Sequence, residues 1–328
     1  MRADRYQTQK LLLEIGESGQ QKLAQATVFV VGAGGLGCAL LPWLAGAGIG
    51  HIHVMDDDVI ELKNLHRQPL YHMEDLGQSK ADIACQRLRA LNPDCQFTSH
   101  VMAAQPDTVR ALIQKSDVVI DAADNFATTY VLSDACQRVQ CVLVSGSSLG
   151  WEGYVGAFCG NGPSYRAVFP KIPENSQKNC GQAGIVGPVV AVIGSVMAQF
   201  CLSLLLDITP SPVGELRRWD ARVMQMRHFS FRDAEEPSHF WPFLAWSELR
   251  DDDVVVDVRL LDEKPTLERA KLYQKPLPEF EKSYDDLPQD RRLVICCQTG
   301  VRASKAASFL AGKGYTNIAL MAVAKQPL

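Results

Sequence analysis

Residues 28–38 read VFVVGAGGLGC. The apolar residues predict a short buried strand, and Gly32, Gly34, Gly35 and Gly37 predict a tight turn that leads into a helix. Such a turn lets the backbone approach a phosphate, and the N-terminus of the helix offers N–H groups and the positive end of its dipole. Taken alone, the pattern fits an NAD(P)-dependent dehydrogenase at least as well as an ATP-binding enzyme.

Further strands and helices alternate on both sides of this turn. Strands that are apolar on both faces and alternate with helices predict a doubly wound, Rossmann-like α/β fold with a mostly parallel sheet. We expect strands at Thr27–Val31, His51–Met55, Asp117–Asp121 and Cys141–Ser145, and helices at Thr8–Leu23, Leu36–Ala47, Lys80–Leu91, Phe126–Val139 and from Pro188 onward. Trp151–Val168 and a hairpin at Glu215–Phe231 predict an antiparallel extension, and Lys171–Gly184 a loop.

A second, smaller α/β unit is expected after the charged stretch Arg232–Ser238, which is typical of a linker. We place the boundary between residues 1–235 and 236–328. The expected elements of the second unit are strands at Val254–Val258, Leu293–Cys296 and Asn317–Met321 and a helix at Ser304–Lys313.

Composition narrows the class of protein. The 328 residues are 47% hydrophobic and 21% charged with a net charge of −4, which fits a soluble globular protein and argues against nucleic acid as a partner. The apolar stretch Ile185–Leu206 is interrupted by glycine and proline, so we expect a buried helix and no membrane span. With no export signal at the N-terminus, the ten cysteines predict reduced thiols and a cytoplasmic location.

Charged residues beyond the glycine turn favour a triphosphate over a dinucleotide. Asp56 and Asp58 follow the second strand, where an acidic side chain binds ribose hydroxyls. The stretches NLHRQ (64–68) and GQSK (77–80) bring Arg67 and Lys80, which a hydride-transfer enzyme does not need. A triphosphate does need them, because its charge must be neutralised as pyrophosphate leaves. The alternative for each is a solvated surface charge.

Acidic residues also end the Asp117–Asp121 strand, in the sequence DAADN (121–125). Ligands of open α/β sheets bind at the carboxyl ends of the strands, and a carboxylate there can hold Mg²⁺ on the phosphates. Asp124 is therefore the expected Mg²⁺ ligand, with Asn125 beside it. The alternative for Asp124 is an N-cap of the following helix.

Together these motifs, with NCGQAGIVGPVVAVIGS (179–195), resemble the E1-like activating family that includes ThiF, MoeB and HesA. The resemblance spans about residues 28–199. It implies a homodimer that binds Mg-ATP and adenylylates the C-terminal glycine of a small ubiquitin-like sulfur carrier ending in Gly-Gly. By the resemblance Asp56 contacts the ribose, Asp124 lies in the metal region, and the phosphates are held by Asn64, Arg67, Gln68 and Lys80.

Two departures from the family pattern stand out. The second arginine of the family's N-terminal R-Y-x-R-Q motif, which reaches the ATP of the partner subunit, is Thr8 here, with Arg5 and Lys10 as possible substitutes. Many relatives carry zinc on two C-x-x-C pairs, but Ser164–Ala167 stands at the first and nothing matches the second. We expect no zinc site and ordinary packing in its place.

Two cysteines are candidate sulfur-handling residues. Cys180 lies in the Lys171–Gly184 loop, where cysteines of ThiF-like relatives can link covalently to the carrier; the alternative is a bystander thiol. Cys297 begins the turn CQTGVRA (297–303) between a strand and a helix, where N–H groups, the helix dipole and Arg302 would favour a thiolate or persulfide.

This turn, with VVVDVR at 254–259 and its Asp257, resembles rhodanese sulfurtransferases over about residues 243–321. The stretch between Arg259 and Arg291 lacks the usual family pattern. The combined prediction is adenylylation of the carrier, then attack by a Cys297 persulfide on the acyl-adenylate, with hydrolysis or reduction giving a thiocarboxylate. A persulfide donor such as a cysteine desulfurase is the further partner. The alternatives are a weakened E1-like scaffold that docks a carrier and, with less support, an NAD-dependent oxidoreductase.

Overall fold

Strand β1 (Thr27–Val31) lies inside a sheet of eight strands in the order β3-β2-β1-β4-β5-β6-β7-β8. The computed structural model describes residues 4–172 and 184–324. The first five strands of the sheet are parallel, and β6, β7 and β8 add an antiparallel extension. Their bounds are β2 His51–Met55, β3 Gln96–His100, β4 Val118–Asp121, β5 Val142–Leu149, β6 Glu152–Cys159, β7 Glu215–Asp220 and β8 Gln225–Ser230. This arrangement confirms the predicted fold class.

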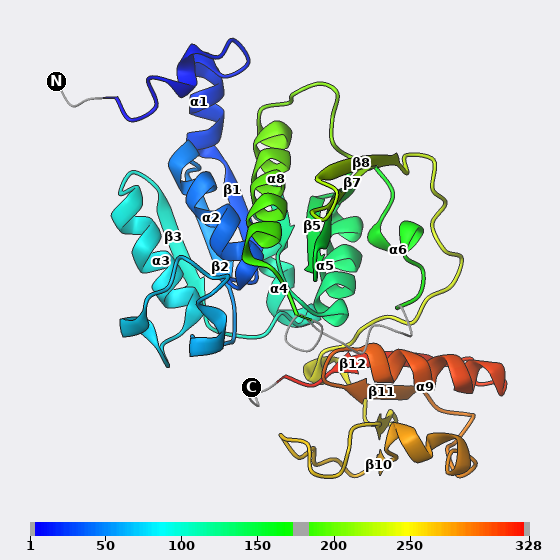
Figure 1. Cartoon of the computed structure of the whole chain (residues 1–328). Coiled ribbons are helices and arrows are strands. Elements are labelled where there is room, and N and C mark those ends of the chain that lie inside the picture. The colour runs from blue at the N-terminus through cyan, green and yellow to red at the C-terminus, as the bar shows by residue number, and fades with distance from the viewer. Residues whose placement is uncertain (1–3, 173–183, 325–328) are drawn as a thin grey trace.

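Helices cover both faces of the parallel part (Figure 1). One apolar cluster joins α2 (Gly35–Ala47), α3 (Lys80–Leu91) and α8 (Gly187–Leu205) to one face of the sheet. A second cluster joins α4 (Pro106–Ile113) and α5 (Phe126–Val139) to the other face. The carboxyl ends of the parallel strands are therefore left for a binding site between the two layers.

Helix α8 packs against α2 and against β5 and β6. Gly194 permits this close approach, since a Cβ atom there would lie 2.5 Å from the Cβ of Ala39. Among the described residues α8 is the one helix long and apolar enough to cross a membrane, a test that the core helix of a soluble protein also passes. Its place in the structure is that of a core helix.

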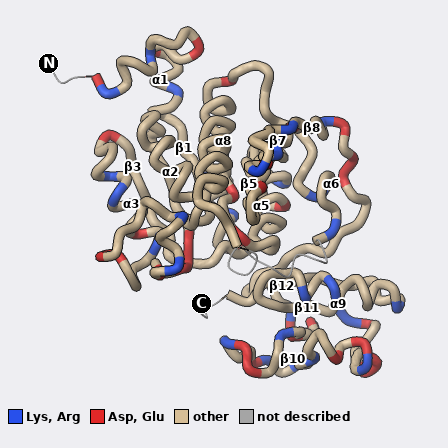
Figure 2. Tube along the Cα trace, in the orientation of Figure 1, with Lys and Arg blue, Asp and Glu red and all other residues tan. Residues whose placement is uncertain are grey.

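The second sheet has four parallel strands in the order β10-β9-β11-β12. They are β9 Val254–Asp257, β10 Leu272–Gln274, β11 Leu293–Cys297 and β12 Ile318–Ala322, with α9 (Val301–Gly312) after β11. This smaller unit lies beside α4 and α5 (Figure 1), and one apolar cluster includes residues of both sheets. Figure 2 shows that α2 and α8 carry no charged residue, as expected of core helices, while acidic and basic residues are interspersed over other parts of the trace.

Two expected elements differ from the structure. The helix predicted for Thr8–Leu23 is a 3₁₀ turn at Gln9–Leu11 followed by α1 (Gly16–Gln25). Gly16 has a positive φ of 52°, and Leu13 is 98% exposed. A helix continued through Leu13 would bury no apolar surface there, so the chain turns instead. The antiparallel stretch expected to reach Val168 ends at Cys159, after which the short helix α6 (Tyr165–Val168) is capped by the Ser164 hydroxyl.

Candidate active site

The glycine turn between β1 and α2 is tightly built. Gly32 has φ +99°, and a Cβ atom there would lie 2.6 Å from the carbonyl carbon of Ala122 at the end of β4. A Cβ on Gly37 would lie 2.2 Å from the Gly32 carbonyl oxygen. Gly34 is the N-cap of α2, and no side chain caps this helix. The first N–H groups of α2 are thus offered to a ligand, as a phosphate site requires.

Asp56 braces this turn from the end of β2. Its carboxylate accepts hydrogen bonds from Ala33 N (2.7 Å) and Asp58 N (2.8 Å). Burial raises the pKa of Asp56 to about 6, against the opposing effect of Lys80. Asp56 therefore orders the backbone on which a ribose would rest, in addition to the ribose contact predicted from the sequence.

Lys80 is the first residue of α3 and is only 5% exposed. Its Nζ lies 2.9 Å from a carboxylate oxygen of Asp58. A lysine is electrostatically unfavourable at the N-terminus of a helix and costly to bury, and the ion pair with Asp58 offsets part of that cost. The structure thus excludes the alternative of a solvated surface charge for Lys80.

The NLHRQ segment contributes an amide next to the glycine turn. Gln68 is buried, its Oε1 has no hydrogen-bond partner, and its Nε2 would lie 3.6 Å from a Cβ on Gly34. The buried Asn64 accepts a hydrogen bond from Glu61 N through Oδ1. The Arg67 guanidinium is held by Lys63 O (3.1 Å) and His66 (2.8 Å). An unpartnered buried amide facing the turn fits a polar ligand there.

Tyr71, which we did not single out from the sequence, joins two of these segments. Its hydroxyl lies 2.6 Å from Ala33 O and 3.1 Å from Lys80 O, and its side chain is buried. The only available signal was its place three residues after the NLHRQ motif. Tyr71 therefore ties the glycine turn to the N-terminus of α3.

The end of β4 separates the three polar residues that the sequence grouped there. Asn125 is the N-cap of α5, accepting from Thr128 N at 2.9 Å, so the alternative of Asp124 as the cap is wrong. Asp124 is exposed on the turn before α5. Asp121 is fully buried and accepts hydrogen bonds from Thr129 and Ser145. Asp124 is thus available to a ligand, whereas Asp121 holds the turn that presents it.

Asp121 predicts a pH dependence of folding. Burial raises its pKa to about 6, while the hydrogen bonds from Thr129 and Ser145 act in the opposite direction. The folded state then binds a proton more tightly than the unfolded state, so this contribution to stability is present below about pH 4 and is lost as pH rises through 6. Between pH 4.5 and 7 the free energy of unfolding should fall by about 2 kcal/mol more in the wild type than in Asp121→Asn, measured by urea denaturation. Equal pH slopes would contradict the assignment.

Polar contacts occupy the place where many relatives carry zinc. The Ser164 N–H and hydroxyl each donate to a carboxylate oxygen of Glu236, both at 2.6 Å. Arg166 pairs with Asp134 at 2.6 and 2.8 Å. Contacts between protein groups therefore fill this place, and one of them comes from Glu236 in the stretch assigned as a linker. Within residues 4–172 and 184–324, no three His, Cys, Asp or Glu side chains are grouped to hold a metal ion.

At the N-terminus, the two basic residues near Thr8 have partners within their own chain. Arg5 donates to Leu91 O at 2.9 Å, and Lys10 pairs with Asp4 at 2.5 Å and Glu17 at 2.7 Å. Neither is therefore set aside for a phosphate, and the consequence of Thr8 for adenylylation stays an open prediction.

Cys297 ends β11 and is fully buried. Its Sγ accepts a hydrogen bond from Ala303 N at 3.3 Å, as the predicted turn requires. Arg302 pairs with Glu263 at 2.7 Å, so its charge is already compensated rather than reserved for the sulfur. Burial and the nearby Asp257 raise the pKa of the neighbouring Cys296. The second candidate cysteine, Cys180, lies outside the described residues.

Asp257, at the end of β9, has Arg259 as its charged partner. Its carboxylate forms a buried ion pair with Arg259, with oxygen–nitrogen distances of 2.8 to 3.2 Å. Arg259 also donates to Pro265 O at 2.9 Å. This pair stabilises the strand end and the chain that follows, a structural role.

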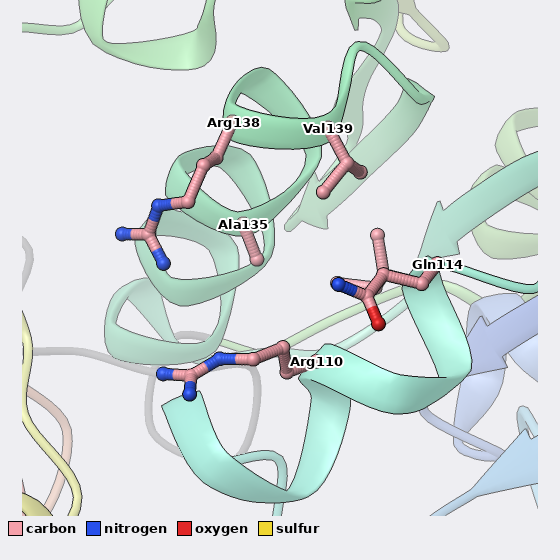
Figure 3. Close-up of a pocket in the computed structure, with 6 residues that line it drawn as sticks. Arg110, Gln114, Ala135, Arg138 and Val139 are labelled. Atoms are coloured by element: carbon pink, nitrogen blue, oxygen red, sulfur yellow. The ribbon is translucent and has the colours of Figure 1, made fainter.

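A surface hollow of about 350 Å³ lies between α4 and α5, away from all these residues. Figure 3 shows Arg110 and Arg138 reaching out on the same side of it, with Gln114, Ala135 and Val139 around it. A second hollow of about 260 Å³ lies between the two sheet units and is lined in part by Arg166, Phe240 and Phe243. Neither includes a residue that the sequence assigned to the nucleotide.

Comparisons with known proteins agree with the two units. The ThiF family profile matches residues 6–239, and the rhodanese-like domain profile matches residues 244–323. The sulfur carrier protein adenylyltransferase of Thermus thermophilus is 39% identical over 236 residues, covering 70% of this chain and 87% of that protein. The adenylyltransferase and sulfurtransferase MOCS3 of Culex quinquefasciatus is 40% identical over 230 residues, covering 70% of this chain.

The match spans 52% of that MOCS3 protein, about half its length. Among solved structures, E. coli MccB with ATP superposes with a TM-score of 0.63 at 20% identity, covering 73% of both chains, which supports the fold. The chain therefore belongs to the ThiF family and carries a rhodanese-like domain after its ThiF domain.

Proposed function

We propose that this chain uses ATP to adenylylate the C-terminal glycine of a small ubiquitin-like sulfur-carrier protein, and that Cys297 then supplies sulfur to it. The observation that carries the first step is Lys80, which is buried at a helix N-terminus beside the glycine turn. The ion pair with Asp58 offsets part of the cost of burying that lysine, and a triphosphate at the open N-terminus of α2 is a ligand that would offset more of it. The names of the Thermus and MOCS3 relatives point to the same activity.

The residues present fit ATP at this edge of the sheet. The Oε1 of Gln68 lacks a hydrogen-bond partner, and Asp56 orders the turn where a ribose would lie. Asp124 is the proposed ligand of Mg²⁺, which would offset phosphate charge. Lys80 and Arg67 would bind the phosphates, and Lys80 would exchange part of its contact with Asp58 for the nucleotide.

The proposed reaction has two bond exchanges, in which pyrophosphate and then AMP are the leaving groups. A carrier carboxylate oxygen attacks the α-phosphorus, the bond to pyrophosphate breaks, and an acyl-adenylate results. A terminal persulfide sulfur on Cys297 attacks the acyl carbon, the bond to the AMP oxygen breaks, and an acyl disulfide forms. A thiol then attacks Cys297 Sγ, which breaks the S–S bond, releases the thiocarboxylate and leaves a mixed disulfide on Cys297. Another thiol attacks that mixed disulfide and restores Cys297, and the two thiols leave joined as a disulfide. Reduction is favoured over hydrolysis because water at the acyl carbon would return the carboxylate, and water at Cys297 Sγ would leave a sulfenic acid instead of a free thiol.

We further propose a homodimer in the cytoplasm that receives its sulfur from a persulfide donor such as a cysteine desulfurase. The ThiF-family membership and the reduced state expected for the cysteines support this setting. No nucleic acid or membrane is expected to take part.

The test is ATP–pyrophosphate exchange with a carrier present. We expect labelled pyrophosphate to enter ATP only with a carrier that ends in Gly-Gly, and a carrier lacking its last glycine is the matched control. The second candidate, a scaffold that binds a carrier without turning over ATP, is motivated by Thr8 in place of the family arginine. Carrier binding without exchange for any cognate carrier would favour the scaffold.

A further inference from the structure

The turn that carries Cys297 packs directly on the ThiF domain. The carbonyl oxygen of Thr299 accepts a hydrogen bond from the backbone N–H of Ala127 at 3.2 Å. Ala127 lies in the first turn of α5, whose N–H groups have no partner within the helix. The Cys297 turn therefore supplies an acceptor that this helix end requires.

Gly300 makes the approach of the two backbones possible. It has φ +84°, and an added Cβ atom would lie 2.9 Å from the Phe243 ring and 3.2 Å from the Cβ of Ala127. A larger residue would be strained in this conformation and would push the turn away from α5. The fit is therefore specific to glycine at this contact.

A second set of contacts joins α4 of the ThiF domain to the rhodanese-like domain and supports the same relative orientation of the two domains. Arg110 pairs with Glu248 at 2.7 Å, and Gln105 donates to Ala322 O at 3.1 Å. The Ser247 hydroxyl donates to Asp107. With the apolar cluster that joins the two units, these contacts define one arrangement rather than a loose tether.

The contact lies next to the proposed adenylate site. Asp124 and Asn125 immediately precede the turn of α5 that Thr299 contacts, and Thr299 is two residues beyond Cys297 in the chain. Cys297 has no exposed surface in this arrangement. Because the sulfur is enclosed, the turn has to open locally before an acyl group can reach it. The contact of Thr299 with Ala127 holds this turn beside the end of β4, at the edge of the sheet where the nucleotide is proposed to bind.

We propose that this docked arrangement delivers sulfur in cis: the Cys297 persulfide of a chain attacks the acyl-adenylate formed on the same chain. The proposal rests on the function proposed above. The bond formed joins the terminal persulfide sulfur to the carrier's acyl carbon, and the bond broken releases AMP. Thr299, Gly300 and Ala127 act as positioning residues for this step.

The test combines two variants that each lack one step. Lys80→Ala chains with one tag and Cys297→Ala chains with another are co-expressed, and the species that carry both tags are purified. A second sample is a simple mixture of the two variants, each expressed and purified separately. Cis delivery predicts thiocarboxylate formation at least about a hundredfold below wild type in the doubly tagged species and in a simple mixture. Restored formation in either sample overturns cis delivery. A wild-type chain that exchanges pyrophosphate but makes no thiocarboxylate instead overturns the proposed sulfur step.

A charge reversal tests whether the docked arrangement is required. Glu248→Arg places two guanidinium groups against each other at the α4 contact, and Arg110→Glu with Glu248→Arg restores opposite charges as the matched control. We expect several-fold slower thiocarboxylate formation in the single variant, recovery in the double variant, and unchanged pyrophosphate exchange in both. A single variant with wild-type thiocarboxylate formation would contradict a role for docking.

Discussion

Replacing Cys297 by alanine is expected to lower thiocarboxylate formation by more than about a thousandfold while carrier-dependent pyrophosphate exchange continues. The Cys297 sulfur lies in a turn whose Ala303 N–H contacts it, and no residue of the proposed nucleotide site contacts this sulfur in the described part of the chain. The variant therefore removes the thiol that carries the persulfide and leaves the site near Lys80 intact. The measurements are thiocarboxylate by mass spectrometry of the carrier and isotope exchange into ATP.

Cys296→Ala is the matched control. Cys296 is equally buried, one residue earlier on β11, and burial raises the pKa of its thiol, which keeps it protonated. We expect Cys296→Ala to retain thiocarboxylate formation. Loss of pyrophosphate exchange in a folded Cys297→Ala chain would show that the two chemical steps are not divided between the two domains.

Replacing Lys80 by alanine is expected to slow pyrophosphate exchange by roughly a hundredfold to a thousandfold. The loss removes the one buried cation described beside the glycine turn, so charge on the phosphates is no longer offset as pyrophosphate leaves. Because Asp58 then loses its partner, the thermal unfolding temperature must be measured as well.

Lys63→Ala is the control for Lys80→Ala. Lys63 lies in the segment that precedes Arg67, and it is exposed with a surface ion pair to Glu61. A pair of this kind contributes little, so exchange should be unchanged. Wild-type exchange in Lys80→Ala would remove the main support for a triphosphate at this edge of the sheet.

The regular part of the fold was predictable because its signals are local. Strong apolar periodicity placed the strands at 27–31 and 51–55 and the helices at 80–91 and 126–139 with the bounds that the structure has. Strand β3 and helix α4 were missed, since β3 lies at the edge of the sheet with mostly half-buried side chains and α4 is short. The break in the N-terminal helix was also missed because the lack of a core beneath Leu13 is a tertiary property.

The candidate site likewise has residues that local motifs predict and residues that only tertiary contacts identify. The glycine turn, Asp56 and Lys80 could be named from sequence motifs, and the structure brings them together at one edge of the sheet. Residues that act through contacts distant in sequence could not be named. Tyr71 and Glu236 carry no motif of their own, and their roles appear only when Ala33 and Ser164 are brought beside them.

The apolar cluster that runs from α4 and α5 into the second sheet has a consequence for how the chain melts. When one of the two domains unfolds, the other loses the apolar surface that was buried between them. The unfolding of one domain therefore destabilises the other. Heating should therefore give one cooperative transition rather than two. A chain cut before Phe243 would expose the flank of α5 to water and should be prone to aggregation.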